Sequence, residues 1–213
     1  AHWAGQLSMA RALALMGHAD RAIAMATNAS MKFCSTVGTD TLDCQRVRLA
    51  TADIANWLGN VDVAMQKIAS VTFTDAPAIA ALLKTARALL ELNRTPSEAT
   101  VSAVDETLAA VTGQGGLGVR DAIRKRLGAA ERLLATGHEA LAEQLLAPLL
   151  LDPPAKDAID GIDHIWLQLW QARAAGTLAT QSALTDALAE ELGKQHPSVL
   201  RWNGWRANSA KPE

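Results

Sequence analysis

Few residues in this chain of 213 combine the types and the spacing that chemistry requires. Residues 113–118 match the pattern G-x-G-x-x-G, and Arg120 and Arg124 follow at the expected start of a helix, where a phosphate could bind. A dinucleotide-binding fold places this motif after a strand, within a βαβ unit. No strand pattern precedes it here, so we interpret the run as a loop between helices.

Histidines and carboxylates are too sparse for a metal site. His138 and Glu139 lack the second histidine that a zinc protease motif needs, and Asp160 with His164 is one helical pair without a third ligand. The chain also has no G-x-S-x-G nucleophile elbow and no P-loop lysine. We therefore expect a protein that is not an enzyme and that holds no metal or cofactor.

Cys34 and Cys44 are the two cysteines, and they flank a connection rich in Ser, Thr, Gly and Asp. A bridge between them would close a loop of about 10 residues and stabilise the fold by about 2 to 3 kcal/mol. Two interpretations stay open. A disulfide would indicate a periplasmic or other extracytoplasmic location, whereas two free thiols would be ordinary in the cytoplasm.

The composition favours helices that pack closely. Hydrophobic residues make up 49% of the chain and are mostly Ala and Leu, with no Tyr and two Phe, whereas strands favour aromatic and β-branched residues. Charged residues interrupt each apolar segment, so we expect no insertion into a membrane. A formal net charge of −2 gives no basic face for a nucleic acid. We expect an all-α protein whose partner is a protein or a peptide.

The element that must position any functional side chains in this chain is a helical hairpin, and residues 7–29 show its pattern most clearly. Apolar residues recur there every three to four positions on both sides of a turn at Gly17. Asp20 could cap the second helix, and Thr41 or Asp43 the next one. Comparable turns follow at intervals of 34 to 44 residues, at Gly59, Asn93, Gly137 and Gly176. This spacing predicts about five antiparallel helical hairpins.

The glycine-rich run divides these hairpins into two groups. Residues 1–112 hold hairpins one to three, residues 113–119 form a joint, and residues 120–213 hold hairpins four and five with a short capping helix. We expect the end from Lys211 to be frayed. Because the chain is rich in Ala and begins with Ala rather than Met, we expect it to be one part of a larger bacterial protein.

The small residues around the turns resemble those of the tetratricopeptide repeat (TPR) family. The matching positions of the first hairpin are Ala10, Leu13, Gly17, Ala22, Ala26 and Ala29; those of the second are Ala52, Ala55, Gly59 and Ala64; those of the fourth are Ala130, Leu133, Gly137 and Ala142. The long first interval is similar to the repeats of the kinesin-light-chain type. The third and fifth hairpins depart from the pattern after the turn, and a plain helical bundle is the alternative fold.

This resemblance implies a right-handed superhelix whose first helices line a concave groove for a peptide or a partner helix. By this register the groove residues are Leu7, Arg11, Arg46, Leu49, Asp53, Asn56, Leu83, Arg87, Arg124, Leu127, Glu131, Trp166, Trp170 and Arg173. Arginines alternate with apolar residues, which suits an extended peptide that carries carboxylates, because arginine binds a carboxylate through two parallel hydrogen bonds. The alternative is that most of these arginines form a solvated face.

Tryptophans gather in the last quarter of the chain, with Trp166 and Trp170 on one helical stripe and Trp202 and Trp205 after them. They either pack the core of the last hairpin or anchor a partner or a second copy in a homodimer. Taken together, the sequence predicts a protein-interaction or sensory scaffold within a signalling or regulatory protein. An assembly or secretion chaperone and a small-molecule-responsive regulatory domain are the alternatives.

Overall fold

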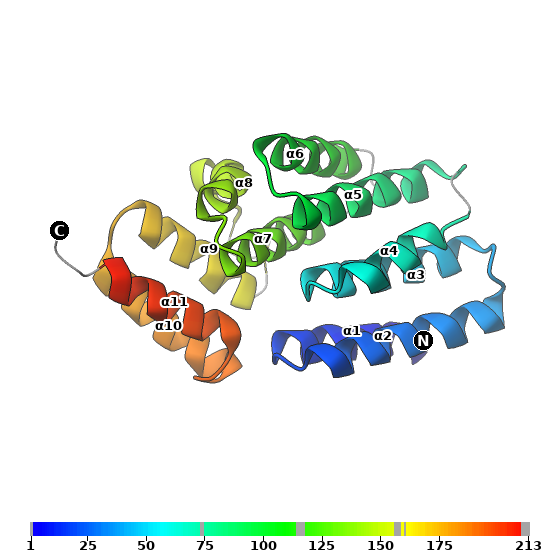
Figure 1. The fold of residues 1–213 in the computed structure, drawn as a ribbon, viewed down its shortest axis with the longest axis horizontal. Coiled ribbons are helices and arrows are strands. Elements are labelled where there is room, and N and C mark those ends of the chain that lie inside the picture. The colour runs from blue at the N-terminus through cyan, green and yellow to red at the C-terminus, as the bar shows by residue number, and fades with distance from the viewer. Residues whose placement is uncertain (1, 73–74, 114–117, 156–158, 160, 210–213) are drawn as a thin grey trace. The chain divides into compact units, whose positions relative to one another are not determined.

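The computed structural model describes residues 2–72, 75–113, 118–155, 159 and 161–209. All regular structure in these residues is helical, with no strand (Figure 1). The helices are α1 (His2–Leu15), α2 (Ala19–Val37), α3 (Leu42–Trp57), α4 (Val61–Ala69), α5 (Pro77–Arg94), α6 (Glu98–Gly113), α7 (Val119–Ala135), α8 (Glu139–Leu151), α9 (Gly161–Ala174), α10 (Leu178–Leu192) and α11 (Pro197–Ser209). The prediction of an all-α chain is confirmed.

Four of the predicted hairpin turns share one geometry. Their glycines have positive φ angles, +80° at Gly17, +77° at Gly59, +80° at Gly137 and +67° at Gly176, a region that other residues enter only with strain. In each turn the residue after the glycine donates its N–H to the carbonyl five residues earlier, over 2.8 to 2.9 Å. This bond closes the end of the first helix as a Schellman cap, so the same local signal ends α1, α3, α7 and α9.

The turn predicted at Asn93 is displaced, because α5 continues to Arg94. The Asn93 side chain points back into the fold, where its Nδ2 donates to the backbone carbonyl of Asn56 at 2.9 Å and to the Oδ1 of Asn56 at 2.8 Å. Asparagine is therefore selected here for a contact between α5 and α3 rather than for a turn.

Two of the proposed helix caps can be compared with the structure. Thr41 is the N-cap of α3, and its Oγ1 accepts a hydrogen bond from the Cys44 backbone N–H at 3.3 Å, as predicted. Asp20 is not a cap, because α2 begins one residue earlier with His18 at the N-cap position. Asp20 lies in the first turn, where a negative charge still favours the helix dipole.

The chain divides into two compact units, residues 1–122 and residues 123–213. The division falls within the first turns of α7, because this helix already begins at Val119. The joint predicted at residues 113–119 lies just before this point, and its residues 114–117 are outside the described part of the chain.

Unit 1 contains three hairpins that follow one another, α1/α2, α3/α4 and α5/α6 (Figure 1). Helix α3 is central, since it packs against α1, α2, α4 and α5. Its neighbours approach closely because alanines stand at the contacts; Ala10, Ala22, Ala26 and Ala64 are fully buried. Replacing such a methyl by a larger side chain would force the helices apart.

In unit 2, helix α7 makes a polar contact with each of three other helices. Arg126 donates to the backbone carbonyl of Leu145 on α8 at 2.6 Å, and Arg124 donates to Asp163 on α9 at 3.1 Å. Glu131 accepts hydrogen bonds from α11. The helices α8 to α11 pack against one another in chain order.

Candidate interaction surfaces

Eight of the residues predicted to line a groove have buried side chains. They are Leu7, Leu49, Asn56, Leu83, Leu127, Glu131, Trp166 and Trp170, and none exposes more than 8% of its surface. The predicted stripe of each first helix includes the side on which the neighbouring helices pack, so these residues fill the interior. They present almost no surface to a partner.

The two tryptophans illustrate this outcome. Trp170 is 1% exposed and meets Trp202 edge to face, with 5.4 Å between the ring centroids. Trp166 is 3% exposed. Of the two interpretations given above, core packing describes both rings, while the side chain of Trp205 lies outside the described part of the structure.

The remaining predicted residues differ in how much their side chains are engaged. Arg11, Arg46 and Arg87 are exposed, and Arg46 forms an exposed ion pair with Asp43 at 3.4 Å. Arg124 is half-buried because its Nε donates to the buried carboxylate of Asp163. The charged residues that stay accessible therefore lie mainly in unit 1.

Three of these charges lie on the first helices of the three hairpins of unit 1. Arg11 and Asp53 each stand six residues before the glycine of their turn, Gly17 and Gly59, and Arg87 stands six residues before Asn93, where α5 continues instead of turning. Their helices are neighbours, since α1 contacts α3 and α3 contacts α5. Arg11 and Arg87 are exposed and Asp53 is half-buried. We call Arg11, Asp53 and Arg87 the first-helix row; its charge alternates from basic to acidic to basic.

Glu131 is the most deeply buried carboxylate among the described residues, at 3% exposure. Its Oε2 accepts from Arg201 at 3.2 Å and its Oε1 accepts from the indole N–H of Trp202 at 3.1 Å. Burial raises the pKa of this carboxyl, and the charge of Arg201 and the bonds from Arg201, Trp202 and Ser198 oppose that rise. Glu131 therefore joins α11 to α7 and is not available to a partner.

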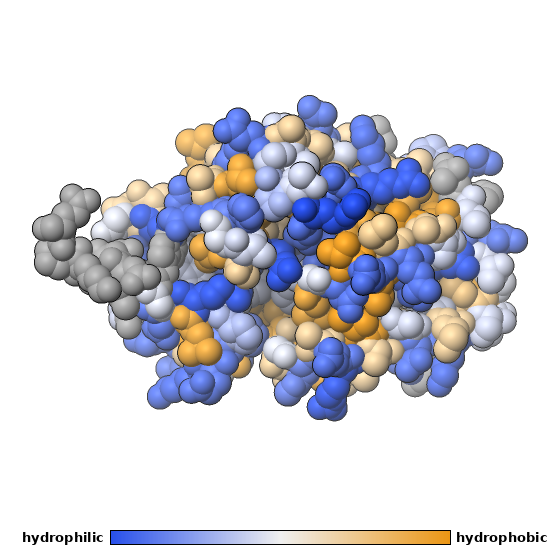
Figure 2. Space-filling model, in the orientation of Figure 1, coloured by the Kyte–Doolittle hydropathy of each residue, from blue (hydrophilic) through white to orange (hydrophobic). Residues whose placement is uncertain are grey.

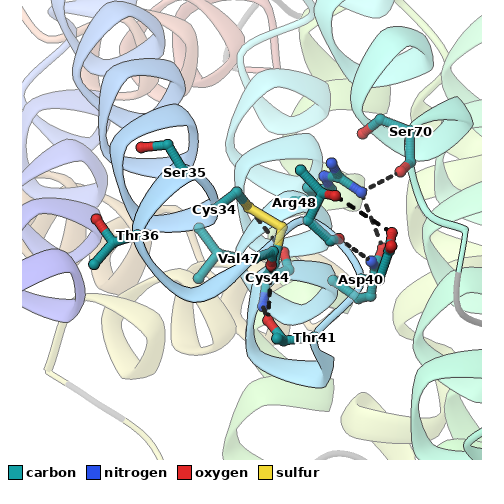
Figure 3. Close-up of a disulfide and its surroundings, with 12 residues drawn as sticks. Cys34, Ser35, Thr36, Asp40, Thr41, Cys44, Val47, Arg48 and Ser70 are labelled. Atoms are coloured by element: carbon teal, nitrogen blue, oxygen red, sulfur yellow. Dashed lines mark hydrogen bonds between the residues drawn. A yellow bond between two sulfur atoms is a disulfide. The ribbon is translucent and has the colours of Figure 1, made fainter.

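Cys34 and Cys44 form a disulfide that joins α2 to α3 (Figure 3). Directly after it, the fully buried Gln45 donates from Nε2 to the carbonyl of Thr39 at 2.7 Å and accepts from the Thr72 backbone N–H at 3.3 Å. Arg48 donates to the carbonyl of Ser70 (Figure 3). One turn of α3 therefore anchors two segments: the connection between α2 and α3, through Thr39, and the segment that follows α4, through Ser70 and Thr72.

A larger and a smaller hollow open among the described residues; the larger lies in unit 2, among α8, α9 and α10, and has a volume of about 690 Å³. Its polar lining includes Glu139, Glu143, Arg173 and Gln181. Arg173 pairs with both glutamates, at 2.8 Å from Glu143, and lies 5.7 Å from the ring centre of Trp170. Burial lowers the pKa of Arg173 to about 10, so the guanidinium is cationic at neutral pH.

The smaller hollow lies in unit 1 between α1 and α2 and has a volume of about 380 Å³. It was not predicted, although the polar residues Arg21, Asn28 and Lys32 recur along α2 at helical spacing. This polar stripe was the sequence signal from which the hollow could have been predicted. Apolar side chains also reach the surface of unit 1 between hydrophilic ones, as the face in Figure 2 shows.

The motifs that could carry chemistry give no assembled site. Residues 114–117 of the glycine run and Asp160 lie outside the described residues, and His138 is at the N-cap position of α8. No group of three or more His, Cys, Asp or Glu side chains within the described ranges is placed to hold a metal ion. None of the described helices is long and apolar enough to cross a membrane.

Comparisons of the chain with models of known protein families, with curated proteins and with solved structures give no match.

Proposed function

We propose that this chain is a non-catalytic scaffold of TPR-like helical hairpins, arranged as a right-handed superhelix, that binds a peptide or a partner helix. The observation that carries the proposal is the first-helix row of unit 1. The first helices of the three hairpins are neighbours, which brings these positions into a row, and a repeat array binds extended partners through such rows. In this proposal the chain serves a larger bacterial signalling or regulatory protein.

The ends of the row determine the partner chemistry that we propose. Arg11 and Arg87 are exposed, and neither forms an ion pair with another described residue. An arginine binds a carboxylate through two parallel hydrogen bonds. A partner segment with two acidic residues, one for each arginine, would complement the two ends of the row.

The disulfide supports an extracytoplasmic location in this proposal. Protein disulfides persist in oxidising compartments and are rare in the cytosol. In this proposal the scaffold lies in the periplasm, where the disulfide is stable, and its first-helix row binds segments of partner proteins there.

Affinity capture with charge-reversed variants tests the proposal. The purified chain, the double variant Arg11→Glu/Arg87→Glu and the control Lys194→Glu are immobilised, and captured proteins from extracts of the native cell are identified by mass spectrometry. Lys194 is exposed between α10 and α11, outside the row, and its reversal makes the same change of charge as each substitution in the row. We expect the double variant to lose partners that the wild type and the control retain. Identical capture by all three would refute the row as the binding surface.

A second candidate, a small-molecule-responsive regulatory domain, is favoured by the hollow of unit 2. Its volume falls in the range of ligand sites, and Glu139, Glu143 and Arg173 converge on it. Two carboxylates against one guanidinium favour a cationic ligand such as an organic amine. Thermal unfolding with a panel of amines tests it: a ligand that stabilises the wild type but not Glu139→Gln/Glu143→Gln supports this function, and the absence of any shift refutes it.

A further inference from the structure

The hollow between α1 and α2 in unit 1 is a groove formed by those two helices alone. We call it the α1/α2 groove; its lining is Gln6, Leu13, Arg21, Ala24, Met25, Asn28 and Lys32. On α2 the lining positions recur at intervals of three to four residues, so they form one stripe along the helix. The groove is therefore parallel to α2 and extends for most of its length.

This groove lies on a different flank of the hairpin from the one that α3 covers. Ala26 and Ala29 of α2 pack in one cluster with Val47 and Ile54 of α3, and Cys34 is bonded to α3. Arg21, Asn28 and Lys32 are exposed and recur on a different stripe of α2 from these alanines. Met25 lies between the two stripes, because it lines the groove and also packs against the cluster. The hairpin thus has one side filled by a helix of its own chain and another side that is hollow.

The groove carries positive charge at both ends. Arg21 and Lys32 are 11 residues apart on α2, which is about 16 Å along the helix axis. No acidic side chain lines the groove. Neither Arg21 nor Lys32 forms an ion pair with another residue in the described part of the chain. The hairpin as a whole holds one acidic residue, Asp20, in a chain whose net charge is −2.

Exposed methionines stand on or beside the two helix stripes that line the groove. Met9 and Met16 stand on the α1 stripe that contains Gln6 and Leu13, and Met31 stands beside Asn28 on α2. Their exposed fractions are 54%, 51% and 60%. Methionine is apolar and has three rotatable bonds, so it adapts to the apolar face of a bound partner.

We infer that the α1/α2 groove binds an amphipathic helix of a partner protein that carries two acidic residues about three turns apart. The occupant is a helix because α3 already packs across α1 and α2 on the other flank, and because two parallel helices leave a groove that a third one fills. Carboxylates spaced by about 11 residues on this helix would reach Arg21 and Lys32 together. Its apolar residues between them would contact Met9, Met16 and Met25.

This site is separate from the first-helix row. Arg11 does not line the α1/α2 groove, and no groove residue belongs to the row. The inference therefore goes beyond the proposed function and stands or falls without it.

Fluorescence anisotropy with a designed peptide tests the inference on the full chain. The probe is a labelled helical peptide of about 18 residues with two glutamates about 11 positions apart and leucines between them on the same face. Its control has the same composition with both glutamates moved to the opposite face. We expect the probe to bind at least about tenfold more tightly than the control peptide, with an affinity that falls as salt is added.

Protein variants identify the site. Each of Arg21→Glu and Lys32→Glu should weaken binding of the probe about threefold to tenfold, and the double variant more than tenfold. The control Lys84→Glu makes the same change of charge as each single variant, at an exposed position of α5. It should leave the affinity for the probe within about twofold of that of the wild type. Far-ultraviolet circular dichroism verifies that each variant is folded.

Four results would overturn the inference. They are no binding of the probe at about 1 mM, equal binding of both peptides, equal weakening by Lys84→Glu and by the double variant, and unchanged binding by the double variant. Sedimentation is run in parallel. A dimer that dissociates in Arg21→Glu/Lys32→Glu would assign the groove to a second copy of this chain and would also overturn the inference.

Discussion

Replacing Glu131 should show whether α11 is held to α7 by a buried carboxyl. In Glu131→Ala the indole N–H of Trp202, whose side chain is 1% exposed, loses its acceptor. A buried donor without a partner costs about 1 to 3 kcal/mol. Arg201 is 30% exposed and can turn to water, so its loss adds only about 0.5 to 1 kcal/mol. We expect a decrease of about 2 to 4 kcal/mol in the free energy of unfolding.

Glu131→Gln separates the charge from the hydrogen bond. Its amide oxygen can still accept from Trp202, so at low pH, where the native carboxyl is protonated, the variant should differ little from the wild type. The pKa of Glu131 is raised in the fold, so above pH 4.5, the ordinary pKa of a glutamate, the native state binds more protons than the unfolded state. The wild type then loses up to about 1.4 kcal/mol of stability per pH unit until the raised pKa is reached.

Urea denaturation at several pH values between 4 and 8, followed by circular dichroism, measures both effects. The difference in stability between Glu131→Gln and the wild type should shift in favour of the variant as the pH rises. The control is Glu190→Gln, which replaces an exposed glutamate on α10, and we expect it to cause no measurable change in the free energy of unfolding. If the variant instead becomes relatively less stable as the pH rises, the ion pair with Arg201 outweighs burial and the reasoning is refuted.

The other predictions concern unit 1. The intact mass measured without reductant should be lower by two hydrogens than after reduction, and Cys34→Ser/Cys44→Ser should lower the free energy of unfolding by about 2 to 3 kcal/mol; an unchanged mass would show free thiols. Asn93→Ala should cost about 1 to 3 kcal/mol in urea denaturation, because the buried Asn56 loses both hydrogen bonds, and a loss below about 0.5 kcal/mol would contradict that contact. Thr41→Ala should cost about 1 kcal/mol, whereas Thr41→Asn, which can also cap α3, should cost less; equal losses would argue against the cap.

The sequence predicted the helices well because their signals are local. Glycines such as Gly17 and Gly137 end a helix through their own backbone freedom, and the three-to-four-residue spacing of apolar side chains requires no knowledge of distant residues. The position of Asn93 was misjudged for the opposite reason. Its partner, Asn56, is 37 residues away, and asparagine is one of the residue types that favour turns.

The candidate site was harder to predict, since periodicity gives the stripe of a helix but not what covers it. Trp170 and Glu131 stand at the same place in their hairpins as Arg11, yet Trp202 of α11 packs against both. Arg11 has no such neighbour and stays exposed. Whether a side chain on a first helix is buried depends on contacts 70 residues away, such as that between Glu131 and Arg201, which no local pattern reveals.

Titration calorimetry with a partner captured by the wild-type chain tests the central claim most directly. The purified partner is titrated into the wild type, into Arg11→Glu/Arg87→Glu and into Lys194→Glu at low salt. We predict that the double variant weakens binding at least about tenfold, while Lys194→Glu stays within about twofold of the wild type. Equal affinities for all three proteins would contradict the account, because the first-helix row would then make no contact with the partner.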